Sequence, residues 1–194
     1  MIGLLGAHRT GKSTLMNEFV KKYPAVKATT FNVGALQKEL GFNSNKQDYP
    51  FDVLMQIQEH LYITFDKHLE SLRTQDAVLR QESLYISDRT PLDLIGYTMI
   101  HANGNLSKIQ SKWLIDYVDS CIKLTNKYYD KLILIQPGIT PVKDNDTSAE
   151  PILGFMEHLN AIYLSYMIDN RVTPQKLIMP RDLLDLQQRV NFIS

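Results

Sequence analysis

Eight consecutive residues near the amino terminus, Gly6 to Ser13, carry the strongest chemical signal in the sequence. They read Gly-Ala-His-Arg-Thr-Gly-Lys-Ser, the G-x-x-x-x-G-K-S pattern of a phosphate-binding loop, or P-loop. The glycines let backbone N–H groups turn inward around phosphate oxygens, Lys12 brings a positive charge to the β- and γ-phosphates, and the Ser13 hydroxyl is a Mg²⁺ ligand. The pattern predicts a bound nucleoside triphosphate. It does not predict the fate of the γ-phosphate, because kinases, ATPases and GTP switches share this loop.

The loop runs directly into a helical pattern, whose positive dipole end adds to the attraction for phosphate. Arg9 occupies a variable position of the loop, where it either helps to hold phosphate or faces solvent. We expect the following residues to bind the nucleotide: Gly6, Ala7, His8, Arg9, Thr10, Gly11, Lys12, Ser13 and Thr14.

A second charged motif follows another apolar run and reads Asp88-Arg89-Thr90-Pro91-Leu92-Asp93. Asp88 could hold Mg²⁺ through water or orient an attacking hydroxyl, and the planar fork of Arg89 could hold an acceptor or a transferred phosphate. The competing interpretation is a helix cap with a local salt bridge, because Asp before Thr-Pro is ordinary capping chemistry. Beside a P-loop we favour the functional interpretation, with Lys12, Asp88 and Arg89 as catalytic residues and Ser13 and Asp88 as the metal site.

Short apolar runs alternate with longer helical patterns, which predicts an α/β fold with a parallel sheet covered on both faces. We expect a three-layer α/β/α sandwich with five strands. Ligands of such sheets bind outside the carboxyl ends of the strands, predicted here at Leu5, Phe31, Ser87, Ile135 and Met179. The predicted strands span residues 1–5, 26–31, 83–87, 132–135 and 177–179, and the predicted helices span 12–22, 50–73, 106–128, 150–171 and 181–192, with another beginning at Pro91.

Composition limits the class of protein. The chain has 194 residues, 44% of them hydrophobic, and its 21 basic and 21 acidic residues give no net charge. These values fit one globular domain over residues 1–194 and argue against disorder and against a broad nucleic-acid surface. The single Cys121 excludes a disulfide scaffold, and no apolar run is long enough to span a membrane. With no targeting segment recognised, we expect a cytoplasmic protein, or one of the host cytoplasm if it is viral.

The two motifs together resemble the small P-loop nucleoside and nucleotide kinases. More narrowly, the chain resembles the AAA-type kinase domains of phage deoxynucleotide kinases and bacterial nicotinamide riboside kinase. The resemblance implies a sheet order of 2-3-1-4-5, ATP with Mg²⁺, and phosphoryl transfer to a nucleoside-type acceptor by Lys12, Ser13, Asp88 and Arg89. Asp93 matches too, although a structural role on its helix is favoured. The segments that carry the resemblance are 6–13, 39–41, 58, 87–97 and 189–193.

The sequence departs from these kinases at the lid. Such kinases usually carry lid arginines that neutralise charge during transfer, but residues 138–149, where we expect a mobile lid, contain no Arg and only Lys143 as a cation. Charge stabilisation would then fall to Arg9, Arg89 or Arg171.

The acceptor should lie between the second and third strands, opposite the P-loop. A phosphate acceptor needs arginines there and a hydroxyl acceptor needs a carboxylate; residues 30–72 contain carboxylates and no Arg, which favours a hydroxyl. Gln58 lies on an apolar helical stripe and either finds a core partner or hydrogen-bonds the edge of a base or pyridine amide. Gln58, Glu59 and Lys143 are our candidates for acceptor binding. A hydroxymethylated base within phage DNA is an extended form of the same idea, and the only nucleic-acid partner we consider.

Two alternatives stay open. Arg181 follows the last strand, where this fold usually wraps the adenine, and it either stacks on the base or serves as a cap or surface residue. The whole chain could also be a nucleotide-dependent ATPase or switch module without a small acceptor, whereas the intact Lys12–Ser13 pair argues against a purely binding protein. The oligomeric state is not predicted.

Overall fold

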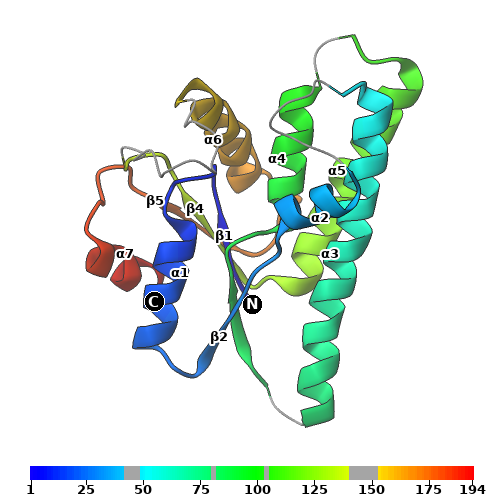
Figure 1. Ribbon diagram of the computed structural model, residues 1–194. Helices are drawn as coiled ribbons and strands as arrows, with labels where there is room; N and C mark the ends of the chain where they lie inside the picture. The colour runs from blue at the N-terminus through cyan, green and yellow to red at the C-terminus, as the bar shows by residue number, and fades with distance from the viewer. Residues whose placement is uncertain (42–48, 80–81, 103–104, 140–152) are drawn as a thin grey trace.

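The computed structural model describes residues 1–41, 49–79, 82–102, 105–139 and 153–194. Helices lie on both sides of a central sheet, as the ribbon shows (Figure 1). Within the described ranges, none of the helices combines the length and the apolar character needed to cross a membrane. In chain order the elements are β1 Ile2–Leu5, α1 Lys12–Lys22, β2 Val26–Thr29, α2 Val33–Glu39, α3 Phe51–Leu79, β3 Leu84–Ser87, α4 Pro91–His101, α5 Lys108–Tyr128, β4 Lys131–Ile135, α6 Leu153–Ile168, β5 Gln175–Met179 and α7 Leu186–Ile193.

The sheet has five parallel strands in the order β2-β3-β1-β4-β5, which confirms the predicted α/β architecture and strand order. β1 is the central strand and pairs with β3 on one side and β4 on the other. Because all strands point the same way, the segments that follow β1 and β3 leave the sheet side by side. The topology therefore brings the P-loop and the Asp88–Arg89 motif to one edge.

Alternation along the central strands divides the interior into two cores. Leu5, Leu132 and Leu134 face one core, which is covered by α3, α4, α5 and α6. Leu4 and Ile133 face the other, which is covered by α1 and α7. Successive side chains of a strand point to opposite faces, so continuous apolar strands are expected where both faces are covered.

The predicted bounds hold best for the elements around the P-loop and the Asp88–Arg89 motif. Elsewhere, α5 begins at Lys108 rather than 106, α6 ends at Ile168 rather than 171, and β5 begins at Gln175 rather than 177. Three further differences have a local cause. β2 ends at Thr29 rather than Phe31, because it pairs only with β3 and its register puts Thr29 opposite Ser87, the last residue of β3. α3 continues to Leu79, since nothing before that residue breaks the helix. α7 begins at Leu186 rather than residue 181, because the Asp185 side chain caps it by accepting from the Gln188 N–H at 2.8 Å.

One short helix was not predicted. α2 begins after Asn32, whose side chain accepts a hydrogen bond from the Ala35 N–H at 3.0 Å. The Asn cap is a recognisable start signal, but none of the α2 residues is buried, so the segment has no apolar stripe to reveal it.

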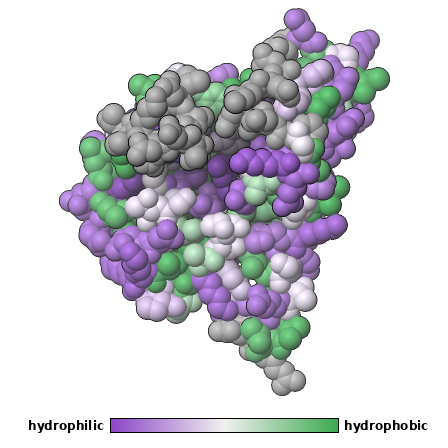
Figure 2. Space-filling view, viewed as in Figure 1, coloured by the Kyte–Doolittle hydropathy of each residue, from purple (hydrophilic) through white to green (hydrophobic). Residues whose placement is uncertain are grey.

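Polar side chains predominate over much of the face in Figure 2, and one apolar group stands out at the tip where α3 ends and β3 begins. The exposed fractions there are 76% for Val78, 57% for Leu79 and 45% for Leu84. This tip lies at the amino end of β3, away from the edge that carries the two motifs.

Candidate functional site

The P-loop connects β1 to α1 and turns sharply at Gly11. Gly11 is the residue before the helix and has φ 82°, a left-handed conformation that favours glycine. Inside the loop, the Thr10 hydroxyl donates to the Ala7 carbonyl oxygen at 3.0 Å, and both residues are buried. The loop is therefore held in shape by its own hydrogen bonds as well as by the strand and the helix it joins.

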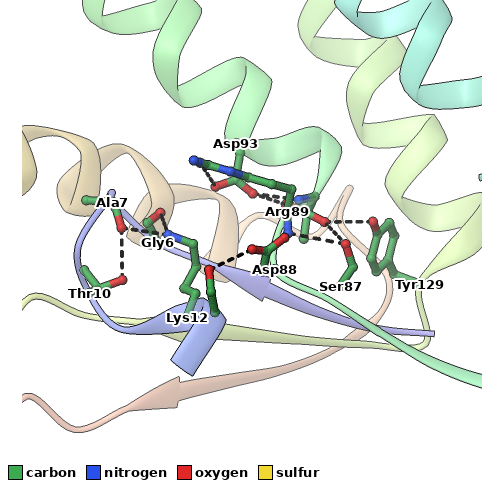
Figure 3. Close-up of polar contacts among 11 residues, drawn as sticks. Gly6, Ala7, Thr10, Lys12, Ser87, Asp88, Arg89, Asp93 and Tyr129 are labelled. Carbon is green, nitrogen blue, oxygen red and sulfur yellow. Dashed lines mark hydrogen bonds and ion pairs between the residues drawn. The ribbon is translucent and has the colours of Figure 1, made fainter. Parts of the chain in front are cut away.

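The Lys12 side chain lies across this loop. Its Nζ donates to the carbonyl oxygens of Gly6 and Ala7, each at 2.7 Å, and the residue is only 6% exposed (Figure 3). Burial, reinforced by the positive charge of Arg89, lowers the pKa of Lys12 to about 7. A buried ammonium whose hydrogen-bond partners are neutral carbonyls is not charge-compensated, so it strongly attracts an anion.

Ser13 and Asp88 come from the two motifs and contact each other directly. The Ser13 hydroxyl donates to Asp88 Oδ2 at 2.8 Å, and Oδ1 of the same carboxylate is buried and has no hydrogen-bond partner among the described residues. A hydroxyl oxygen beside an unsatisfied carboxylate oxygen suits Mg²⁺, which takes one or two protein oxygens and leaves its other positions to water and phosphate. These two residues therefore fit the predicted metal site.

The capping interpretation of Asp88 does not hold, because other residues cap α4. Thr90 is the N-cap, and its N–H donates to Asp93 Oδ2 at 2.7 Å. Burial raises the pKa of Asp93, although the charges of Arg89 and Lys12 oppose the shift. Asp93 thus has the structural role on its helix that was favoured from the sequence, and Asp88 takes no part in the cap.

Arg89 points back over its own helix. Its Nη1 lies 3.5 Å from Asp93 Oδ1, and its guanidinium carbon lies 5.8 Å from the ring centre of Tyr97. Burial opposes its charge, but Asp93 and then Tyr97 outweigh burial and raise the pKa of Arg89. The local salt bridge considered from the sequence is therefore present, and it holds a permanent cation next to Asp88 with a quarter of the side chain exposed.

The backbone of the Asp88–Arg89 segment is fixed from below. The hydroxyls of Ser87 and Tyr129 both donate to the Arg89 carbonyl oxygen, at 2.6 and 3.0 Å. Gly3 on β1 makes room for this arrangement, because a Cβ there would lie 2.6 Å from Thr90 and 2.7 Å from Tyr129. This short turn after β3 is therefore held in place by three neighbouring segments.

Arg189, on α7, is a site residue that the sequence reasoning missed. It is 4% exposed, its Nη2 donates to the Thr10 carbonyl oxygen at 3.0 Å, and its Nε lies 3.2 Å from Met179 Sδ. A signal was present, since Arg189 shares the buried face of α7 with Val190 and Ile193. A charged residue on such a face needs a polar partner, and here the partner is the P-loop.

His8, Arg9 and Thr14 are three further residues that were predicted to bind the nucleotide. His8 is half-buried, with its ring 5.6 Å from that of Phe155, and burial followed by the charge of Lys12 lowers its pKa. Arg9 has φ 61° and is partly exposed, and Thr14 is exposed on the first turn of α1.

Gln58 and Glu59, which were predicted to bind the acceptor, both have protein partners. Gln58 is 3% exposed and its Oε1 accepts from the Tyr117 hydroxyl at 3.0 Å, so it does have the core partner considered above. Glu59 accepts from the Trp113 indole N–H at 2.6 Å. Consecutive helical residues point in different directions, so one of these side chains enters the core while the other lies on the exposed side of α3 and α5.

Two predicted cations also have protein partners. Arg181 forms a bidentate ion pair with Glu157 on α6, at 2.5 and 2.7 Å. Arg171 pairs with Asp169 and Asp119 and precedes β5. Of the three arginines considered for charge stabilisation, Arg171 is misplaced for that role, because the amino end of a parallel strand lies opposite the edge that carries the P-loop. Lys143 and the lid beyond residue 139 lie outside the described residues.

Comparisons with known proteins agree on the fold. No protein-family model and no curated protein matches the chain. Among solved structures, deoxyadenosine kinase from M. mycoides with dCMP and dCDP has a TM-score of 0.67 at 17% identity, over 99% of this chain and 95% of that one. The same enzyme with dCTP has a TM-score of 0.65 at 20% identity, with the same coverage. Thymidylate kinase from Candida albicans has 0.63 at 15%, over 98% and 87%. The chain therefore has the fold of the P-loop nucleoside and nucleotide kinases.

Proposed function

We propose that the protein is a P-loop kinase that transfers the γ-phosphoryl group of ATP to a nucleoside-type acceptor. The observation that carries the proposal is the contact of Ser13 with Asp88, which brings together two motifs 75 residues apart. Around this contact lie the buried ammonium of Lys12 and the guanidinium of Arg89. A kinase needs three things in one place: hydrogen-bond donors that bind the phosphates, a metal site, and a cation beside the group that is transferred.

In this proposal each residue has one task on the donor side. The P-loop N–H groups and Lys12 bind the triphosphate, and the Lys12 ammonium exchanges its carbonyl partners for phosphate oxygens. Ser13 and Asp88 would hold Mg²⁺, which supplies charge neutralisation for the phosphates. Arg9 and Arg181 are proposed as further nucleotide contacts, on the phosphates and the adenine respectively.

The transfer itself forms one bond and breaks another. The acceptor hydroxyl oxygen bonds to the γ-phosphorus, the bond from that phosphorus to the β–γ bridging oxygen breaks, and ADP leaves. The hydroxyl proton goes to a carboxylate or to solvent. We assign Asp88 to the metal because it already contacts Ser13, and Arg89 to the charge on the group in transfer.

The acceptor is proposed to be a hydroxyl of a nucleoside rather than a phosphate. Gln58 would contact it after leaving Tyr117, Glu59 would do so after leaving Trp113, and Lys143 would be a third contact. The similar structures include enzymes named for a nucleoside and for a nucleotide substrate, so both acceptor classes occur on this fold. A hydroxymethylated base in DNA is a further acceptor to test beside nucleosides and nucleotides. A kinase of this kind would act in the cytoplasm, or in that of the host for a viral protein.

The decisive experiment incubates the protein with Mg²⁺ and γ-labelled ATP against nucleosides, nucleoside monophosphates and hydroxymethylated DNA. We expect label on a nucleoside and none with the Lys12→Ala variant. Label on monophosphates alone would contradict the hydroxyl assignment. ATP hydrolysis that no acceptor stimulates would instead support an ATPase or switch module.

A further inference from the structure

Arg189 connects three segments at the base of the P-loop. Besides its bond to the Thr10 carbonyl and its contact with Met179 at the end of β5, its Nη1 would lie 3.0 Å from a Cβ built on Gly11. The same point is 3.5 Å from the Ile139 side chain, after β4. The guanidinium therefore lies underneath the loop, between the loop and the two strand ends.

We propose that Arg189 is a positioning residue for the phosphate cradle and acts through the Thr10–Gly11 peptide. This inference rests on the proposed function, since it presumes that the P-loop binds phosphate. A trans peptide is planar, and its C=O and N–H point in opposite directions. By holding the Thr10 carbonyl outward, Arg189 directs the Gly11 N–H toward the inside of the loop.

The charge of Arg189 strengthens this effect. A charge-assisted hydrogen bond to a carbonyl polarises the peptide, which makes its N–H a better donor. Within the described part of the chain no carboxylate pairs with the guanidinium, whereas Arg181 and Arg171 are both paired with carboxylates. Arg189 is thus a buried cation that contacts the loop and has no carboxylate partner among the described residues.

The geometry also explains why arginine stands here rather than lysine. The guanidinium reaches Thr10 through Nη2 and Met179 through Nε, two contacts that need a planar fork. A lysine would keep the charge but make one of these contacts at most. The two properties, direction and charge, can therefore be separated by substitution.

The test compares Arg189→Met and Arg189→Lys with the wild-type protein, with Val190→Ala as the matched control. Val190 is fully buried on the same helix and has an apolar side chain, so its truncation loosens α7 without removing a polar contact to the loop. Affinities for ADP and for inorganic tripolyphosphate are measured by titration calorimetry on folded protein, beside thermal unfolding of each variant. The chemical shift of the Gly11 amide on adding tripolyphosphate reports the loop directly.

We expect Arg189→Met to weaken both phosphate ligands by roughly tenfold to a hundredfold, the scale of one charge-assisted bond, and to reduce the Gly11 shift. The affinities of Arg189→Lys should lie between those of the wild type and those of Arg189→Met. Val190→Ala should lower thermal stability while keeping the wild-type affinities. Equal affinity losses in Val190→Ala, or full recovery with Lys, would overturn the positioning role. If the wild type binds and Arg189→Met binds as tightly, the inference fails and the proposed kinase stands; if the wild type binds neither ligand, both fail.

Discussion

The phosphate side and the acceptor side of this molecule differ in how completely their residues meet. On the phosphate side, Lys12 donates to two carbonyl oxygens of the P-loop, and the adjacent Ser13 donates to Asp88 from the other motif. On the acceptor side, the predicted residues Gln58 and Glu59 are bonded to two different side chains of α5. The first group is assembled in the structure as it stands, whereas the second would have to exchange partners to bind a ligand.

The difference follows from what places each group. The phosphate-side residues sit at the carboxyl ends of β1 and β3, which are hydrogen-bonded neighbours, so backbone pairing alone brings them together. The acceptor-side residues project from a helix of 29 residues, where the rotation of the helix decides which side chain meets which. Strand ends therefore place functional groups more tightly than a long helix face does.

The largest effect that can break this comparison is expected from Lys12→Ala. The variant removes the buried ammonium that faces the phosphates, an electrostatic contribution in a partly dry site, and should abolish transfer. The fold should survive because the loop lies at the sheet edge. Activity is measured with labelled ATP and the best acceptor found; more than a tenth of wild-type activity would rule out the P-loop assignment.

Asp88→Asn should have the next largest effect. It keeps the shape and can still accept the Ser13 hydrogen bond, but it removes the charge that we assign to the metal site. Turnover should fall by roughly a hundredfold or more, the usual range for a positioned acid–base or metal group. Thermal unfolding is the control: α4 is capped by Thr90 and Asp93, so stability should hardly change. Lower stability with normal kinetics in the folded protein would mean a structural role only.

These two residues also show how much was predictable. The P-loop, the Asp88–Arg89 turn and their shared edge followed from local pattern plus the rules of parallel sheets. The strand order was implied by the resemblance to the small P-loop kinases. Residues 189–193 contributed to the resemblance, but the contact between Arg189 and Thr10 was not predictable, because the two residues are 179 positions apart in the sequence. The partners of Gln58 and Arg181 depend on how α3, α5 and α6 are rotated, which periodicity gives only to within a face.

A comparison of Arg89→Ala with Lys143→Ala tests where the transferred charge is stabilised. Arg89 is held beside Asp88 by Asp93, and its loss should cost far more than that of Lys143, which we expect to be about tenfold, or ~1.4 kcal/mol. Both variants are assayed at the same saturating ATP concentration. A larger loss of activity for Lys143→Ala would mean that the predicted lid, rather than Arg89 at the sheet edge, supplies the main cation.

The pH dependence of phosphate binding sharpens the role of Lys12. Its pKa of about 7 in the ligand-free protein means that the ammonium loses its proton as the pH rises above 7. A bound polyphosphate requires the charged form, so binding raises this pKa and takes up a proton. Affinity for ADP should therefore fall between pH 7.5 and 9 by up to roughly tenfold per pH unit.

Calorimetry in buffers of different ionisation enthalpy measures that proton uptake. The Lys12→Ala variant should bind weakly and show no pH slope over the same range. A wild-type affinity that stays level up to pH 9 would mean that the ammonium keeps its proton despite burial.

The smallest effect is expected from Arg181. As with Gln58 and Glu59, the question is whether it exchanges its protein partner for a ligand, in this case the adenine. Its guanidinium is paired with Glu157, and exposed ion pairs contribute only about 0–1 kcal/mol, so a stacked adenine could compete for it. We expect Arg181→Ala to raise the KM for ATP by about threefold with kcat unchanged, because it removes binding energy shared by the ground and transition states.

Glu157→Gln is the matched variant: it releases the guanidinium and should lower the KM by a similar factor. Opposite shifts of KM in the two variants would mean that Glu157 and adenine compete for one cation, so that this predicted contact also forms by an exchange of partners. If neither variant moves the KM, Arg181 belongs to the surface, and only the phosphate side of the nucleotide is recognised by residues that the sequence reveals.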